Sequence, residues 1–123
     1  MQTYDKAFVE KFMAPWNARD VDGAMALMTD DCVWEIPRGS EPHGVRFEGS
    51  TAVRDAIVNV FTMLPDIRYE LVHASFGPNL VVLELLVTGT LGDGKKAMFH
   101  ACDVMIVRDG KVAAKRSYRK VTE

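Results

Sequence analysis

The chain has 123 residues, of which 48% are hydrophobic and 26% are charged, and its 15 basic and 17 acidic side chains give a net charge of -2. This length and composition predict one soluble globular domain, spanning residues 1–123, with a single core. Because there is neither a basic surplus nor a run of about 20 apolar residues, we expect binding to neither nucleic acid nor membrane.

The cysteine content points to a reducing compartment. The chain has two cysteines, Cys32 and Cys102, which are far apart in the sequence and form no recognisable disulfide framework. The first ten residues mix charged with apolar side chains and do not resemble a secretory signal peptide. The sequence therefore predicts a cytoplasmic protein with free thiols.

Hydrophobic periodicity divides the chain into a helical first half and a second half of strands. The predicted elements, in chain order, are helices at 3–18 and 21–28, a strand at 32–36, a helix at 51–64, and strands at 67–75, 80–90, 97–108 and 111–120. The polar segment 38–48 is expected to be a loop, and Asp109-Gly110 is a strong signal for a two-residue hairpin turn. This order predicts an α+β fold in which a cone-shaped, curved antiparallel sheet packs on three N-terminal helices and encloses a pocket.

Several local strings then suggest a family. They are WNARDVD at 16–22, ALMTDDCVW at 26–34, HGVRFEG at 43–49 and DVMIVRDGKV at 103–112. In this order, and over nearly the whole chain, they resemble the SnoaL-like proteins of the nuclear transport factor 2-like superfamily. The resemblance implies the cone fold. It does not imply one activity, because that fold carries isomerases, cyclases, dehydratases, epoxide hydrolases and non-catalytic binders.

The chemistries of the family can be compared with the residues present. By resemblance, the tyrosine, base and acid of a ketosteroid isomerase fall on Phe12, Ile36 and Asp103, of which only Asp103 can handle a proton. The positions implied for a limonene-type epoxide hydrolase are filled partly by Ala101 and Ser117, so that mechanism is not expected either. SnoaL itself, a polyketide cyclase, relies mainly on one aspartate of the penultimate strand, and the resemblance places it at Asp103.

Asp103 also stands out from the strand pattern alone. Both faces of its predicted strand are mostly apolar, so its carboxylate must be paired or have a raised pKa. A two-residue turn before the last strand would place Asp103 opposite Arg116, and Ala101 opposite Tyr118. A two-residue loop before the preceding strand would also place Glu84 beside Asp103, whereas a three-residue loop would turn Glu84 to the other face.

These patterns give a predicted site with three catalytic groups: Asp103 accepts and donates the proton, Arg116 orients the Asp103 carboxylate, and Tyr118 donates a hydrogen bond to a substrate oxygen. The residues expected to line the same cavity and bind substrate are Phe12, Trp16, Trp34, Ile36, Phe61, Glu84, Ala101 and Met105. The scattered histidines predict no metal site, and the sequence has no phosphate loop or dinucleotide fingerprint, so no cofactor is expected.

Three functions fit this pattern. The first is a cofactor-independent acid–base enzyme, cyclase- or isomerase-like, acting on an apolar polycyclic or polyketide-like compound. The second is a binding protein with the same pocket and no turnover, and the third is a dimerising module with a filled interior. A homodimer is expected in any case, because no predicted helix covers the strand face that carries His100, Cys102, Val104 and Ile106.

Overall fold

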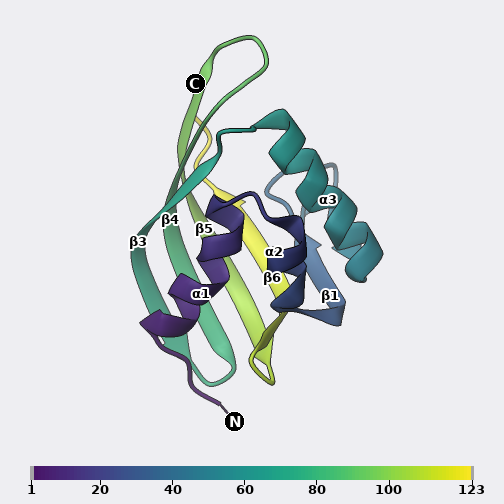
Figure 1. The fold of residues 1–123 in the computed structure, drawn as a ribbon, viewed down its shortest axis with the longest axis vertical. Helices are drawn as coiled ribbons and strands as arrows, with labels where there is room; N and C mark the ends of the chain where they lie inside the picture. Colours follow the sequence, from purple (N-terminus) through teal and green to yellow (C-terminus); the bar gives the residue numbers. More distant parts are fainter. Residues whose placement is uncertain (1, 123) are drawn as a thin grey trace.

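A computed structural model describes residues 2–122 as three helices packed on one side of a curved six-stranded sheet (Figure 1). The elements are α1 (Lys6–Asn17), α2 (Val21–Ala26), β1 (Met28–Glu35), β2 (Arg46–Glu48), α3 (Ser50–Met63), β3 (Arg68–Gly77), β4 (Leu80–Thr90), β5 (Lys96–Arg108) and β6 (Lys111–Arg119). The sheet is not closed, and its strand order is β2-β1-β6-β5-β4-β3. The predicted α+β class and curved cone are confirmed.

Local sequence signals explain where the helices begin and which side they bury. The side chains of Asp5 and Asp20 accept hydrogen bonds from backbone N–H groups in the first turns of α1 and α2, and so satisfy donors that have no partner within the helix. The buried side of α1 is formed by Val9, Phe12 and Trp16, which lie at helical spacing. α1 packs on β3, while α3 packs on β1 and β2.

Two features of the sheet depart from the prediction. Residues 46–48, expected to be part of a loop, form the edge strand β2, which pairs with β1. β1 begins at Met28 rather than at Cys32 and runs parallel to β6, so the sheet is mixed rather than purely antiparallel. Both differences arise from pairing between distant segments, which a local hydrophobic pattern does not record.

The pairing of β5 with β6 also differs from the prediction. The turn at Asp109-Gly110 has two residues, as expected, with both backbone φ angles positive. Beyond it, however, Val107 pairs with Val112 whereas Ile106 pairs with Ala114. One extra residue in β6 therefore forms a β-bulge, and every later side chain of β6 points to the face opposite to that expected.

The connection between β4 and β5 changes the parity in the same way. Thr90 pairs with Lys96, so the loop between them contains five residues, not two. It is closed by hydrogen bonds from the Leu91 N–H to the Lys95 carbonyl and from the Gly94 N–H to the Leu91 carbonyl, both 2.9 Å long. An odd number of loop residues places Leu83, not Glu84, opposite Asp103.

Candidate functional site

The inner face of the sheet holds an ion pair in the core of the protein. Asp103 on β5 and Lys115 on β6 are 4% and 5% exposed, and Lys115 Nζ lies 3.4 Å from Asp103 Oδ2. Lys115 reaches this position because of the bulge in β6, which turns it inward three residues after the buried Val112. Burying two charges is costly even when they are paired, so the interior has a polar centre that packing alone does not require.

A hydroxyl group organises the pair. Ser117 lies opposite Asp103 and donates a hydrogen bond of 2.6 Å to its Oδ1 atom. The same hydroxyl oxygen accepts from Trp34 Nε1 at 3.0 Å and from Lys115 Nζ at 3.2 Å. Its donor and its two lone pairs are therefore all used, which fixes the carboxylate, the amine and the indole relative to one another.

A cluster of four aromatic rings centred on Trp16 lies beside this polar centre, and we call it the aromatic box: Trp16, Trp34, Phe61 and Tyr69. The Trp16 ring makes edge contacts with the other three, at centroid distances of 5.5 to 5.9 Å. Lys115 Nζ lies 4.6 Å from the Trp16 ring centroid and 4.5 Å from that of Trp34, within the range of a cation–π interaction. One donor is left over: Trp16 Nε1 is buried and has no hydrogen-bond partner among residues 2–122.

Burial also shifts the acid–base properties of two groups. It lowers the pKa of Lys115 below the usual lysine value of 10.5, although the charge of Asp103 and the hydrogen bond to it act in the opposite direction. Burial raises the pKa of the Tyr69 phenol, and the negative charge of Asp103 adds to this effect. The site therefore combines a carboxylate, an amine that holds its proton less firmly than usual, and a phenol that stays neutral.

Comparison with known proteins agrees with this architecture. Residues 9–115 match the SnoaL-like domain. The chain belongs to the SnoaL-like family.

Solved structures with the same fold are similar over nearly the whole chain. TerC, co-crystallised with polyporic acid, is 20% identical, with 94% of this chain and 90% of TerC covered and a TM-score of 0.81. A putative SnoaL-like polyketide cyclase from Jannaschia sp. CCS1 is 14% identical, with 94% and 84% covered and a TM-score of 0.80. A protein with a ketosteroid isomerase-like fold from Catenulispora acidiphila, in complex with trimethylamine, is 12% identical, with 94% and 86% covered and a TM-score of 0.81. At these identities the likeness shows the fold alone.

The SnoaL-like domain brings together part of the predicted site. Trp16, Trp34, Phe61 and Asp103 belong to the polar centre and its aromatic box, and the Phe12 ring packs against Trp16 in a tilted orientation with the centroids 6.1 Å apart. The remaining predicted binding residues on the inner side are Ile36, Ala101 and Met105, which belong to the core or pack against it. The side chains around Asp103 are in contact, so the polar centre is closely packed in this structure.

Three predicted residues lie on the other face. Arg116 is exposed and sits 4.0 Å from Glu35 of β1 rather than opposite Asp103, and Tyr118 is 57% exposed and pairs with Cys102. Glu84 is exposed and also pairs with Cys102. The predicted contacts of Asp103 with Arg116 and Glu84, and the inward position of Tyr118, are therefore wrong. The bulge in β6 and the five-residue loop before β5 are the reasons.

Sequence reasoning missed Lys115, the function of Ser117, and Tyr69. The doublet Ala113-Ala114 interrupts the apolar alternation of the last strand, and this break is the signal in the sequence for a bulge that turns Lys115 inward. Tyr69 follows the predicted alternation of its strand, but only the tertiary structure places it beside Trp16 and near Asp103.

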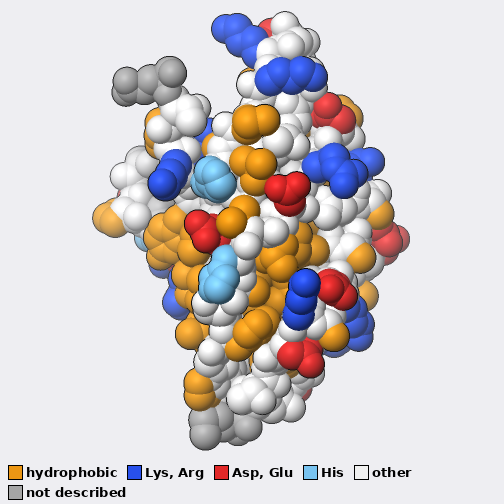
Figure 2. Space-filling model, turned by 90° about the vertical axis from the view of Figure 1, so that its left-hand side faces the viewer, with side chains coloured by type: hydrophobic (Ala, Val, Ile, Leu, Met, Phe, Trp, Pro, Cys, Tyr) orange, Lys and Arg blue, Asp and Glu red, His pale blue; other side chains and the backbone are white. Residues whose placement is uncertain are grey.

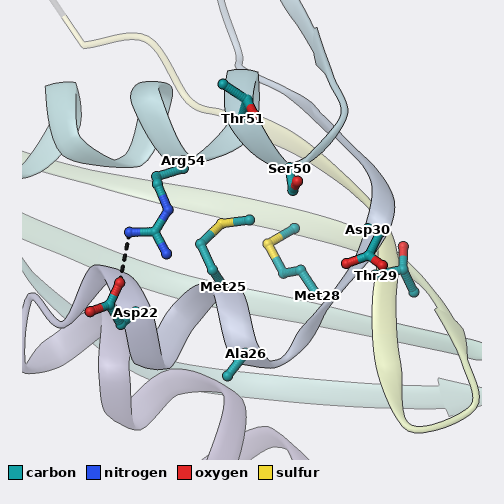
Figure 3. Close-up of a pocket in the computed structure, with 9 residues that line it drawn as sticks. All are labelled: Asp22, Met25, Ala26, Met28, Thr29, Asp30, Ser50, Thr51 and Arg54. Carbon is teal, nitrogen blue, oxygen red and sulfur yellow. Dashed lines mark ion pairs between the residues drawn. The ribbon is translucent and has the colours of Figure 1, made fainter.

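A separate surface pocket of about 380 Å³ lies between α2, β1 and the beginning of α3 (Figure 3). Met25 and Met28 face its centre, and Arg54 pairs with Asp22 at 2.7 Å on one side of it. Both charged side chains are well exposed, and the pocket includes no residue of the aromatic box. We therefore regard it as a surface hollow distinct from the interior site.

The rest of the described chain offers few alternatives. Residues 2–122 contain no group of three or more His, Cys, Asp or Glu side chains that could hold a metal ion. No helix within these residues is long and apolar enough to span a membrane. The outer face of the sheet is partly apolar: Val72, Met98 and Tyr118 are 49%, 63% and 57% exposed. Figure 2 shows a broad hydrophobic area on the side formed by β3 and β4, with scattered acidic, basic and His side chains.

Proposed function

We propose that this SnoaL-like domain binds an apolar, oxygen-bearing small molecule in its interior and moves a proton through Asp103, as a cofactor-independent acid–base enzyme of the cyclase or isomerase kind. The observation that carries the proposal is the buried pair of Asp103 and Lys115, with Lys115 held against the Trp16 and Trp34 rings of the aromatic box. A carboxylate held next to a cation with a lowered pKa can accept and return a proton within one site. The likeness to TerC, which was co-crystallised with polyporic acid, supports a small-molecule ligand.

The charge of the site favours one class of ligand. The space between Trp16 and Trp34, where a cationic ligand would bind best, is already taken by the Lys115 ammonium group. A second cation there would meet a like charge, so we do not extend the trimethylamine ligand of the Catenulispora protein to this chain. A neutral or anionic ligand with a carbonyl, phenol or enolate oxygen fits the available donors. Because the side chains of the centre are in contact with one another, the proposal requires them to shift when such a ligand binds.

The alternative is a binding protein with the same site and no turnover, in which the ion pair only orients the ligand. One set of measurements separates the two. A neutral naphthalene-based fluorescent probe should bind the wild-type protein, and Ala101→Trp, which enlarges a residue of the inner face, should abolish that binding. Among planar ketones and phenols screened for turnover, any product formed should disappear in Asp103→Asn but persist in Glu84→Gln, a carboxylate change on the outer face. Binding without turnover of any compound favours the alternative, and absence of probe binding refutes both.

We further propose a homodimer formed through the outer face of the sheet. His100, Cys102, Val104 and Ile106 lie on this face, as alternation predicts, and Figure 1 shows the three helices on the opposite side. An exposed apolar sheet face of this kind is a common site of association. Sedimentation at micromolar concentration should show a dimer, and Val104→Glu should shift it to monomer. A wild-type monomer would refute the proposal.

The two cysteines bear on the cellular compartment in which the protein works. Cys32 is buried, Cys102 is half-buried, and both are free thiols. Two thiols that stay unpaired suit a reducing environment, so we propose that the protein works in the cytoplasm. Alkylation of both thiols in protein denatured directly from cells would support this location, and recovery of an oxidised form would argue against it.

A further inference from the structure

Lys115 differs from the other lysines of the chain in a way that matters for chemistry. It is 5% exposed, whereas the other lysines, Lys6, Lys11, Lys95, Lys96, Lys111 and Lys120, are all exposed. We propose that Lys115 is a covalent carbonyl-binding residue, whose amine forms an imine with an aldehyde or ketone on an apolar ligand. The inference rests on the proposed function in one respect, since it needs a small molecule to reach the interior.

Burial makes the Lys115 ammonium group easier to deprotonate than that of an exposed lysine, and the reaction requires this deprotonation. An amine attacks a carbonyl only after losing its proton, and burial among apolar side chains is a recognised way to make that loss easier. Asp103 Oδ2, 3.4 Å from Nζ, is an acceptor for the proton. Ser117 fixes this carboxylate through its hydrogen bond to Oδ1, so the acceptor stays close to the amine throughout.

A second observation points to the same kind of ligand. Trp16 is 3% exposed, yet its Nε1–H has no hydrogen-bond partner among residues 2–122. A buried donor without a partner is uncommon and costs free energy, so a ligand oxygen that accepts from it would be stabilised. The Lys115 amine lies over the ring of the same tryptophan. A carbonyl oxygen that accepts from Trp16 would thus be polarised next to the Lys115 amine.

The covalent step balances with the groups present. The Lys115 ammonium group transfers one proton to Asp103, and the nitrogen lone pair then attacks the carbonyl carbon to form a C–N bond. The carbonyl π electrons move to oxygen, which takes up the proton released by nitrogen and gives a carbinolamine. Asp103 returns its proton to this hydroxyl group and the C–O bond breaks. Water departs, and an iminium ion remains. The ammonium and carbonyl are thereby exchanged for iminium and water, and the carboxylate is regenerated. It can then remove a proton from the carbon next to the iminium, which matches the acid–base chemistry proposed above.

Reductive trapping tests the inference. A fluorescent methoxynaphthaldehyde would be incubated with the protein and cyanoborohydride, and the modified lysine would be located by peptide mass spectrometry. The corresponding naphthyl alcohol, which has no carbonyl group, serves as a binding control without covalent chemistry. Lys115→Arg keeps the positive charge and Lys115→Met keeps the length and apolar packing, while Lys111→Arg changes an exposed lysine of the same strand.

We expect a single reduced adduct at Lys115 in the wild type and in Lys111→Arg, and its loss in both Lys115 variants. If the alcohol and the aldehyde bind but no adduct forms at Lys115, the covalent inference is wrong and the proposed binding function stands. If neither compound binds, both are wrong. Labelling spread over the exposed lysines, unchanged in Lys115→Met, would also overturn the inference.

Discussion

Replacing Asp103 with alanine tests whether the buried ion pair exists as the structure describes it. The change leaves the Lys115 ammonium group without its counter-charge in the core, and breaking a buried pair in this way costs about 3–5 kcal/mol. The cost of deprotonating Lys115 sets an upper limit of similar size on this penalty, because the unpaired lysine can become neutral by losing its proton. For a lysine whose ordinary pKa is 10.5, that loss costs about 5 kcal/mol at about pH 7. The cation–π contacts of Lys115 with Trp16 and Trp34 are present in the wild type and in the variant alike, so they do not change this difference. We therefore expect a penalty of about 3–5 kcal/mol in the free energy of unfolding.

Urea denaturation of matched variants measures this penalty. Asp103→Asn should cost less than Asp103→Ala, because an amide oxygen can still accept from Lys115 and Ser117. Adding Lys115→Met to Asp103→Ala should recover much of the loss, since no charge is then left in the core. Glu84→Ala removes an exposed carboxylate and should stay within about 0.5 kcal/mol of wild type.

The pH dependence makes the test specific. The penalty of Asp103→Ala should shrink between about pH 7 and about pH 10, because the unpaired lysine loses its proton more cheaply as the pH rises. Equal midpoints for Asp103→Ala and Asp103→Asn, together with a penalty that does not change with pH, would refute the reasoning. The two side chains would then be solvated rather than coupled.

Three further expectations follow from single groups. Burial lowers the pKa of Lys115 in the folded protein below its unfolded value of 10.5. Between these two pKa values the unfolded chain holds a proton that the folded chain has released, so the free energy of unfolding should rise with pH over that interval. Urea titrations at several pH values should show this rise in the wild type and a flatter profile in Lys115→Met. Because burial raises the pKa of Tyr69 above the ordinary value of 10, an absorbance titration should show a phenolate step at strongly alkaline pH that is missing in Tyr69→Phe; an unchanged titration would place Tyr69 in solvent. Gly44→Ala should destabilise the fold strongly, because Gly44 has a φ of 76° and an added Cβ would lie 2.0 Å from the Ile36 carbonyl oxygen. Gly94→Ala, with a φ of 83° but no atom within 4 Å of the added Cβ, should cost only about 1 kcal/mol by thermal unfolding, and equal losses would contradict the clash.

The elements and the class of the fold could be predicted from the sequence because they depend on local signals. The apolar spacing of α1, the alternation along β4 and the turn at Asp109-Gly110 all act within a few residues, and all three elements are found where expected. β2 was missed for the opposite reason. It is three residues long and mostly exposed, and it is a strand only because β1 lies beside it.

The candidate site shows the same division. Asp103 could be chosen from the sequence, because a carboxylate on a strand with two apolar faces has to be buried and therefore paired. The partner of Asp103 could not be chosen in this way. Whether Lys115 or Arg116 faces Asp103 depends on one extra residue in β6, and the side of Glu84 depends on whether the loop after β4 has an even or odd number of residues. Side chains alternate with a period of two, so each one-residue change reverses a whole strand, and the pairing of distant strands alone decides it.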